Sequence, residues 1–495
     1  MDFKDKEQIN REIIMEDNLK KKTLMGLIWQ YAEKCGTQVV NFVVSVILAR
    51  LLTPADYGLI GLITVFISIA LVFARSGMGQ ALVQKKDAND EDFSTVFYFS
   101  LAVSVAMYAI LFLFSPLIAN SYNEPELIPI IRVLGVTIII GAVYSVQQAK
   151  VQREMDFKKF FYATLVGTLL SAVVGIVLAY SGYGVWALVW QQISCQLINI
   201  LVLFFSVKWR PKLIFSFSKM WGLFNYSWKL LVSGLIDTAY NNMYSLIIGF
   251  RYSPSDLGYY NRGKQYPMLI IENVNGSINS VIFPVLSKMQ DEKERFKATV
   301  RRSMKTSTYI IFPLMAGLAA VAEPLVRIML TDKWLPAVPF IRFCCFTYAF
   351  WPVHTANLQA VKALGRSGIY LLLEGIKKTI GIVILIVTLP YGLTAMMFGR
   401  CIATISSSII NAFPNKKLID YSYIEQIMDM LPSIILSVIM CVAVLLVGTL
   451  NINLYLLLGL QIIVGGVVYL GLSILFKLEC FTYVLDILKG FLKKK

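Results

Sequence analysis

The chain has 495 residues, of which 57% are hydrophobic and only 15% are charged. A soluble globular domain carries about a quarter charged residues, so the composition excludes that class and indicates a membrane protein. The formal net charge of +16 is interpreted as the excess of Lys and Arg in the short cytoplasmic loops of membrane proteins, and no nucleic-acid partner is expected.

Apolar runs of membrane-spanning length recur from one end of the chain to the other. They predict an all-α polytopic membrane protein with about 14 transmembrane helices. Residues 1–23 are of mixed charge without an apolar stretch, so we expect a cytoplasmic tail and no cleavable signal peptide. The approximate cores of the expected spans are 25–51, 58–74, 94–115, 127–147, 160–180, 184–206, 228–250, 264–286, 307–330, 337–357, 368–389, 393–412, 431–450 and 453–476.

A short turn separates the first two expected spans. Thr53 suits the N-cap of a helix, Pro54 the first helical position and Asp56 the third, where a carboxylate accepts from free N–H groups of the first turn. The pattern of hydroxyl, proline, acid and glycine returns at residues 253–258. The residues interpreted as two structural helix starts are Thr53, Pro54, Asp56, Ser253, Pro254 and Asp256.

Further matches follow in the same order along both halves of the chain. PIIR at 129–132 corresponds to PFIR at 339–342, and YGVWA at 183–187 to YGLTA at 391–395. The matches predict a duplication into lobes of six spans, which share one orientation because six is even. We expect an N-lobe over 24–207, a C-lobe over 208–412, and two additional helices with a basic tail over 413–495.

The basic residues predict the orientation. Most of the 46 Lys and Arg residues fall on one side of the membrane when the amino-terminal tail is placed in the cytoplasm. Both termini are then cytoplasmic and the two helix-start turns face outward. Two such lobes around a central cleft are a common transporter plan, in which rocking of one lobe against the other alternates access.

Charged side chains inside the spans are the candidates for function, because such groups are costly unless they face a cavity or a partner. One interpretation is a hydrophilic cavity with a cationic lining that holds an anionic head group. The alternatives are snorkelling to an interface and pairing within a helix, as Glu374 and Lys378 could do at i, i+4. The cavity candidates are Lys34, Arg75, Asp237, Arg262, Glu272, Lys377 and Lys378.

Other reactive groups give weaker signals. His354, the only histidine, fits either a proton-coupling group or a packing residue. The seven cysteines contain no C-x-x-C and are interpreted as packing residues. ATP-binding, metalloprotease and serine-hydrolase motifs are missing, so we expect no cofactor or metal and a transporter rather than an enzyme.

Five segments together resemble bacterial polysaccharide transporters of the O-antigen flippase type, within the multidrug/oligosaccharidyl-lipid/polysaccharide exporter superfamily. The first outer turn is ARLLTPADYG at 49–58, and the loop between spans 4 and 5 is QREMDF at 152–157. The others are LGYYNR at 257–262, FPVLS at 283–287 and ALGR at 363–366. The resemblance covers spans 1 to 12 in order.

The resemblance implies two six-helix lobes forming a V-shaped cavity in the bacterial plasma membrane. It also implies a flippase for an undecaprenyl-pyrophosphate-linked oligosaccharide. Coupling to Na⁺ or H⁺ through Asp237 or Glu272 is a separate hypothesis, and a polysaccharide polymerase is a possible partner. In the related lipid II flippase branch, cationic residues of spans 1, 2 and 8 line the cavity. Arg75 stands at the place of the span 2 arginine and Arg262 is a weaker match for that of span 8, whereas VVSV at 43–46 lacks the charged pair of span 1.

Two other functions remain open on the sequence. One is a cation-coupled small-molecule or multidrug exporter of the same superfamily, which would place acidic groups near mid-span, whereas the intramembrane excess here is basic. The other is a membrane glycosyltransferase or polymerase, which would show larger outer loops with catalytic acids.

Overall fold

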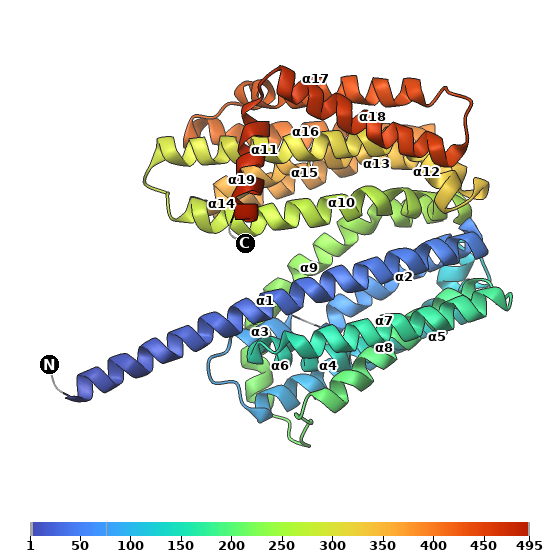
Figure 1. Ribbon diagram of the computed structural model, residues 1–495. Coiled ribbons are helices and arrows are strands. Elements are labelled where there is room, and N and C mark those ends of the chain that lie inside the picture. The colour runs from blue at the N-terminus through green and yellow to red at the C-terminus, as the bar shows by residue number, and fades with distance from the viewer. Residues whose placement is uncertain (1–2, 76, 494–495) are drawn as a thin grey trace. The chain divides into compact units, whose positions relative to one another are not determined.

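The computed structural model describes residues 3–75 and 77–493 (Figure 1). Across these ranges the chain is all-helical and forms no β-strand, which confirms the predicted fold class. Contacts divide the chain into two compact units, Met1–Gly258 and Tyr259–Lys495.

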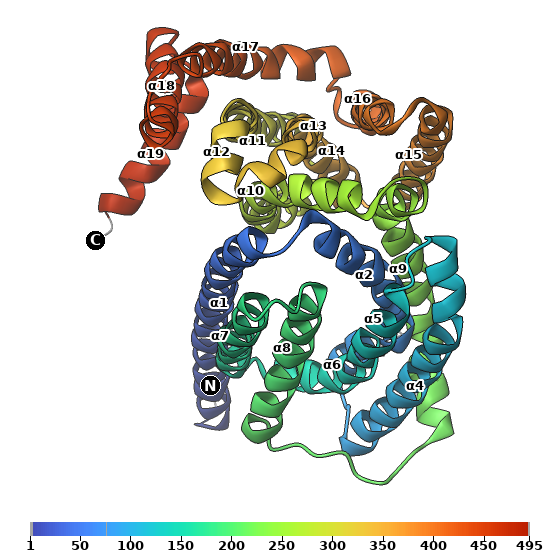
Figure 2. The same cartoon turned by 90° about the vertical axis from the view of Figure 1, so that its right-hand side faces the viewer.

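The first unit contains nine helices and the first residues of a tenth. Within it α1 packs on α7 and α7 on α8, while α2 packs on α4, α6 and α9 (Figure 2). Helix α9, which the repeat assigns to the second lobe, therefore packs on helices of the first. The helices are α1 (Phe3–Leu51), α2 (Pro54–Arg75), α3 (Met78–Gln84), α4 (Asp90–Ser121), α5 (Leu127–Leu134), α6 (Val136–Glu154), α7 (Phe157–Tyr180), α8 (Val185–Ser206) and α9 (Phe217–Arg251).

The second unit is built around α11, which packs on α13, α14 and α17. Helix α17 also packs on α18, and α15 packs on α16. Its helices are α10 (Pro254–Ser287), α11 (Lys293–Ala320), α12 (Ala322–Met329), α13 (Val338–Ala349), α14 (Trp351–Ala363), α15 (Ser367–Thr388), α16 (Leu393–Ile419), α17 (Tyr423–Val447), α18 (Leu454–Leu475) and α19 (Glu479–Lys493), with 3-10 turns at Asp332–Ala337 and Leu389–Tyr391.

The helices make this a multi-pass membrane protein. The described residues hold nine helices long and apolar enough to cross a membrane, or ten if α11 and α12, bent by 65° at their junction, form one span. A helix or pair of helices lies at every expected span, but α10 and α15 carry several charged residues within their length. The number 14 itself stays a prediction.

Spans 4 and 10 are both broken into two helices, and they hold the matching PIIR and PFIR segments. Span 4 breaks between α5 and α6 at Gly135, and span 10 breaks between α13 and α14 at Phe350. Arg132 donates from Nε to Ser115 Oγ of α4 at 3.1 Å, and Arg342 donates from Nε to the carbonyl of Ala319 in α11 at 3.3 Å. Helices α4 and α11 are the third spans of the two repeats, so the matching arginines contact matching helices.

The two helix-start turns have the same hydrogen bonds. Asp56 Oδ2 accepts from Thr53 N at 2.8 Å and from Thr53 Oγ1 at 2.7 Å. Asp256 Oδ2 accepts from Ser253 N at 3.1 Å and from Ser253 Oγ at 2.7 Å. The N–H group of each aspartate in turn donates to the hydroxyl oxygen. Each pair is therefore a capping box, and α2 and α10 begin at the prolines that follow the hydroxyl residues.

The two turns also pack reciprocally. A Cβ atom on Gly58 would overlap the carbonyl of Pro254, and one on Gly258 would overlap the carbonyl of Pro54. Both turns lie in the first unit, which extends to Gly258. Such an exchange of equivalent contacts is what a local two-fold relation between repeated elements produces.

Replacing Asp56 or Asp256 with Ala is expected to lower the stability of the folded protein by about 1 kcal/mol, because each change removes both acceptor bonds of a capping box. The measurement is folded yield and thermal stability of the purified protein by size-exclusion chromatography. Glu126→Ala is the control, since Glu126 is exposed and makes no cap hydrogen bond. Unchanged stability together with lost transport would instead assign the aspartates a direct role in transport.

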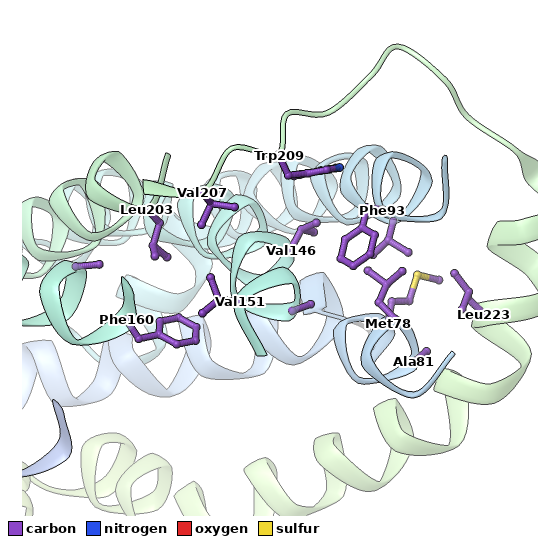
Figure 3. Close-up of a cluster of buried hydrophobic side chains, with 14 residues drawn as sticks. Met78, Ala81, Phe93, Val146, Val151, Phe160, Leu203, Val207, Trp209 and Leu223 are labelled. Atoms are coloured by element: carbon purple, nitrogen blue, oxygen red, sulfur yellow. The ribbon is translucent and has the colours of Figure 1, made fainter. Parts of the chain in front are cut away.

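One end of the first unit is held by a cluster of buried apolar side chains (Figure 3). Met78 of α3, Phe93 of α4, Val146 of α6 and Leu223 of α9 contribute to it. Trp209, from the segment that joins α8 to α9, belongs to the same cluster and is 7% exposed. The cluster therefore fixes α3 and the connecting segment to the ends of longer helices.

Helix α17 is joined to the second unit by polar contacts. Arg301 of α11 holds Asp429 with two bonds of 2.5 and 2.6 Å, and Tyr421 donates to the same carboxylate at 2.9 Å. Nearby, the fully buried Gln426 bonds to Asn357 of α14. Helix α17, the first of the additional carboxyl-terminal helices, is thus bound to α11 and α14 of the predicted second lobe.

Candidate functional site

Arg75 is the last residue of α2, and the next helix, α3, begins at Met78. Gly77, two residues after Arg75, has φ +67° and is the N-cap residue of α3. A Cβ atom at Gly77 would lie 3.2 Å from the Cβ of Leu230 and from the carbonyl of Ser227 in α9. Glycine is suited to this position because the backbone conformation is left-handed and α9 passes closely. Helix α2 therefore ends in an exposed arginine that lies beside α9.

Arg75 lines a pocket of about 320 Å³ within the first unit. Three glutamines share the lining, Gln80 of α3 and Gln148 and Gln152 of α6, together with Ser145. A guanidinium group binds phosphate oxygens in a bidentate manner, and amides and hydroxyls both donate to and accept from sugar hydroxyls. The pocket therefore combines donors for a phosphate with groups that suit a glycan. The full lining is Val72, Arg75, Gly77, Gly79, Gln80, Ser145, Gln148, Ala149, Gln152, Leu230 and Leu231.

The glutamines were not predicted as site residues, although the sequence contains a signal for two of them. Ser145, Gln148 and Gln152 have the spacing i, i+3, i+7, which places them on one face of a helix. Gln152 also lies in the QREMDF segment at 152–157, one of the segments that carry the family resemblance. Gln80 has no such signal, because its position depends on how α3 packs.

Arg153 fixes the position of α3 in the pocket wall. Its guanidinium donates to the carbonyl of Leu82 at 2.9 Å and to those of Lys85 and Lys86 at 2.5 Å each. These carbonyls lie at or just past the end of α3, where helix carbonyls lack intrahelical partners. Arg153 thus acts as a positioning residue for the pocket.

The other cavity candidates of the first unit are Lys34 and Asp237, and both side chains are exposed. Lys34 lies on α1 and Asp237 on α9. Neither lines the Arg75 pocket. Their role in a cavity stays a prediction.

The candidates of the second unit differ from one another in their surroundings. Arg262 is 3% exposed, donates to Gln265 Oε1 at 2.7 Å and lies 5.2 Å from the centroid of the Trp334 ring. Glu272 is exposed. Lys377 pairs with Glu374 at 2.6 Å, so pairing within α15 uses i, i+3, while Lys378 is half-buried.

His354 lies in a polar cluster of the second unit. Its Nδ1 is 3.1 Å from Asn411 Nδ2, and Asn411 is fully buried. For the residues that the structure describes, no group of three His, Cys, Asp or Glu side chains is placed to hold a metal ion. His354 is therefore a half-buried residue whose imidazole makes a polar contact with Asn411.

The comparisons with known proteins agree with one another. A family model described as "Polysaccharide biosynthesis protein" matches residues 47–339. The succinoglycan biosynthesis transport protein ExoT of Rhizobium meliloti is 24% identical over 341 residues, 69% of each chain. The lipopolysaccharide biosynthesis protein WzxC of Escherichia coli is 23% identical over 334 residues, 66% of this chain and 67% of its own.

A solved structure shares the fold. The lipid II flippase MurJ, in an inward closed conformation, superposes with a TM-score of 0.70 and 18% sequence identity. The match covers 91% of this chain and 99% of that one. The chain therefore has the fold of this flippase over nearly its whole length.

Proposed function

Because the chain belongs to the polysaccharide biosynthesis protein family, we propose that it is a flippase for lipid-linked oligosaccharides. It moves an undecaprenyl-pyrophosphate-linked repeat unit from the inner to the outer leaflet of the bacterial plasma membrane, for synthesis of a cell-surface polysaccharide. The relatives named for succinoglycan transport and lipopolysaccharide biosynthesis support this substrate class. The observation that carries the proposal is the pocket in which Arg75 lies among three glutamines.

The chemistry of the pocket matches the substrate. A pyrophosphate that leaves water needs a compensating cation, which Arg75 supplies. The first sugars need hydrogen-bonding partners, which the glutamines supply. The polyprenyl tail is apolar and stays in lipid, so the protein need enclose only the head group. An exporter of organic cations would need an acidic site, and none of the described residues that line the pocket is acidic.

In this proposal the predicted lobes, residues 24–207 and 208–412, alternate access by rocking, and both termini are cytoplasmic. Lys34, Asp237, Arg262, Glu272, Lys377 and Lys378 line the path of the head group. The protein acts as a transporter without its own catalytic step, and a polysaccharide polymerase uses the flipped product.

Sodium or proton coupling through Asp237 or Glu272 is a further part of the proposal. Both are exposed acidic side chains on helices of predicted spans. Dissipating both gradients in proteoliposomes is expected to slow flipping, and an unchanged rate would remove ion coupling from the mechanism.

Depleting this chain in its own cell is expected to make the lipid-linked repeat unit accumulate in the inner leaflet while surface polymer falls. Mass spectrometry of extracted lipids measures the accumulation, and protection of the glycan from a membrane-impermeant glycosidase shows the leaflet. Depleting the polymerase is the control, because the repeat unit then accumulates in the outer leaflet. Normal polymer without accumulation would contradict the proposed function.

A further inference from the structure

A second pocket of the first unit, of about 570 Å³, lies where α6 and α8 end and α4 and α7 begin. It is on the same end of the unit as Arg75 but shares no lining residue with the Arg75 pocket. Its lining holds five basic and two acidic side chains. The lining residues are Asp90, Lys150, Glu154, Lys159, Val207, Lys208, Trp209, Arg210, Pro211 and Lys212.

The connecting segment between α8 and α9 forms one wall of this pocket and is firmly bound. Lys212 pairs with Asp90 at 2.8 Å, and its backbone N–H donates to Ser94 Oγ at 3.0 Å. Arg210 donates to the carbonyl of Phe204 at 2.5 Å and to that of Trp209 at 2.8 Å. The wall is therefore held in place by α4 and by the end of α8.

Lys208 and Lys150 are the two cations of the pocket most available to a ligand. Lys150 pairs with Glu154 only at 3.4 Å, and that carboxylate is exposed. Lys208 is exposed and makes no ion pair within the part of the chain that the structure describes. Since the two acids of the lining are outnumbered, the pocket keeps a positive excess that favours an anion.

Trp209 gives an independent indication of a ligand. Its side chain packs against Phe93 and Phe97, with ring centroids 5.8 and 6.4 Å away. It is 7% exposed, yet its indole N–H has no acceptor among the described residues. Buried donors normally have a hydrogen-bond acceptor, and an indole N–H can only donate. The acceptor that is missing among the described residues can be supplied by a bound ligand.

We propose that this pocket binds a phosphate-bearing anion, with the Trp209 N–H donating to a phosphate oxygen and Lys208 and Lys150 balancing its charge. An anionic phospholipid head group and a free phosphate share this chemistry, and basic pockets between helices on the cytoplasmic side of membrane proteins bind such head groups. The site does not depend on the flippase proposal. A bound anion would join the connecting segment to α6.

The test uses the full-length protein in nanodiscs and three variants. Trp209→Phe keeps the ring contacts and removes the N–H group, while Lys208→Ala removes an exposed charge and leaves the core intact. Lys86→Ala is the matched control, because Lys86 is exposed and lies outside the pocket. One arm measures phosphatidylglycerol retained by the protein, by native mass spectrometry. The other measures binding of inorganic phosphate by thermal shift, in nanodiscs of phosphatidylcholine alone.

The expected result is about ten-fold weaker binding for Trp209→Phe and for Lys208→Ala, and unchanged binding for Lys86→Ala. The loss in the phosphatidylglycerol arm identifies a lipid head group as the ligand, and the loss in the phosphate arm identifies a free anion. Equal binding by all four proteins in both arms would overturn the site.

Discussion

Replacing Arg75 with Ala is expected to lower the flipping rate by about 10- to 100-fold, the factor that corresponds to loss of one charge-assisted contact. Among the described residues that line its pocket, Arg75 is the only charged one, so its loss leaves the head group of the substrate without a cation there. Its side chain is exposed, and the change should therefore leave the protein folded in the membrane. Surface polymer in a complemented strain and flipping in proteoliposomes measure the effect.

One further variant separates the positive charge of Arg75 from the geometry of its guanidinium group, and another serves as a control. Arg75→Lys keeps the positive charge but loses the bidentate geometry, so it should retain part of the rate. Arg295→Ala is the control, since the side chain of Arg295 makes an exposed pair with Glu292 at 3.1 Å, and such pairs contribute little. Normal polymer from Arg75→Ala at normal protein levels would show that Arg75 does not contact the substrate.

Replacing Gly58 or Gly258 with Ala is expected to destabilise the protein by about 3 kcal/mol, at the upper end of the usual cost of overpacking. The added methyl group at either position would overlap a proline carbonyl of the opposite turn. Backbone cannot move aside as a flexible side chain can, so the two helix starts would have to separate. We expect a lower melting temperature and a lower folded yield for each variant.

The two turns are structurally equivalent, and the effects of changing both glycines should therefore be coupled. Because the contacts of Gly58 and Gly258 are reciprocal, the two variants should have similar effects, and the double variant should cost less than the sum, since one separation relieves both overlaps. Gly222→Ala is the control, because a Cβ atom there meets nothing within 4 Å. Wild-type stability in both variants would mean that the turns do not pack in this way in the membrane.

The sequence alone determined features that depend on neighbours along the chain. The helix starts at Pro54 and Pro254 follow from side chains three residues apart. The all-helical membrane fold follows from apolar runs of sufficient length, and repeated local patterns predict the duplication. Arg75 could be singled out because a charged side chain in a membrane-spanning helix is energetically unfavourable unless it faces a cavity or a partner.

The tertiary structure decided what depends on packing between distant segments. Gln80, Gln148 and Arg75 share a pocket only because the ends of α2, α3 and α6 meet, and no local pattern encodes that meeting. The hydrophobic periodicity of the sequence likewise does not predict that α9 packs on α2, α3 and α4 or that Trp209 is buried. A hydrophobic pattern shows which face of a helix is buried, but only the folded chain shows which partner buries it and which polar groups are brought together as a result.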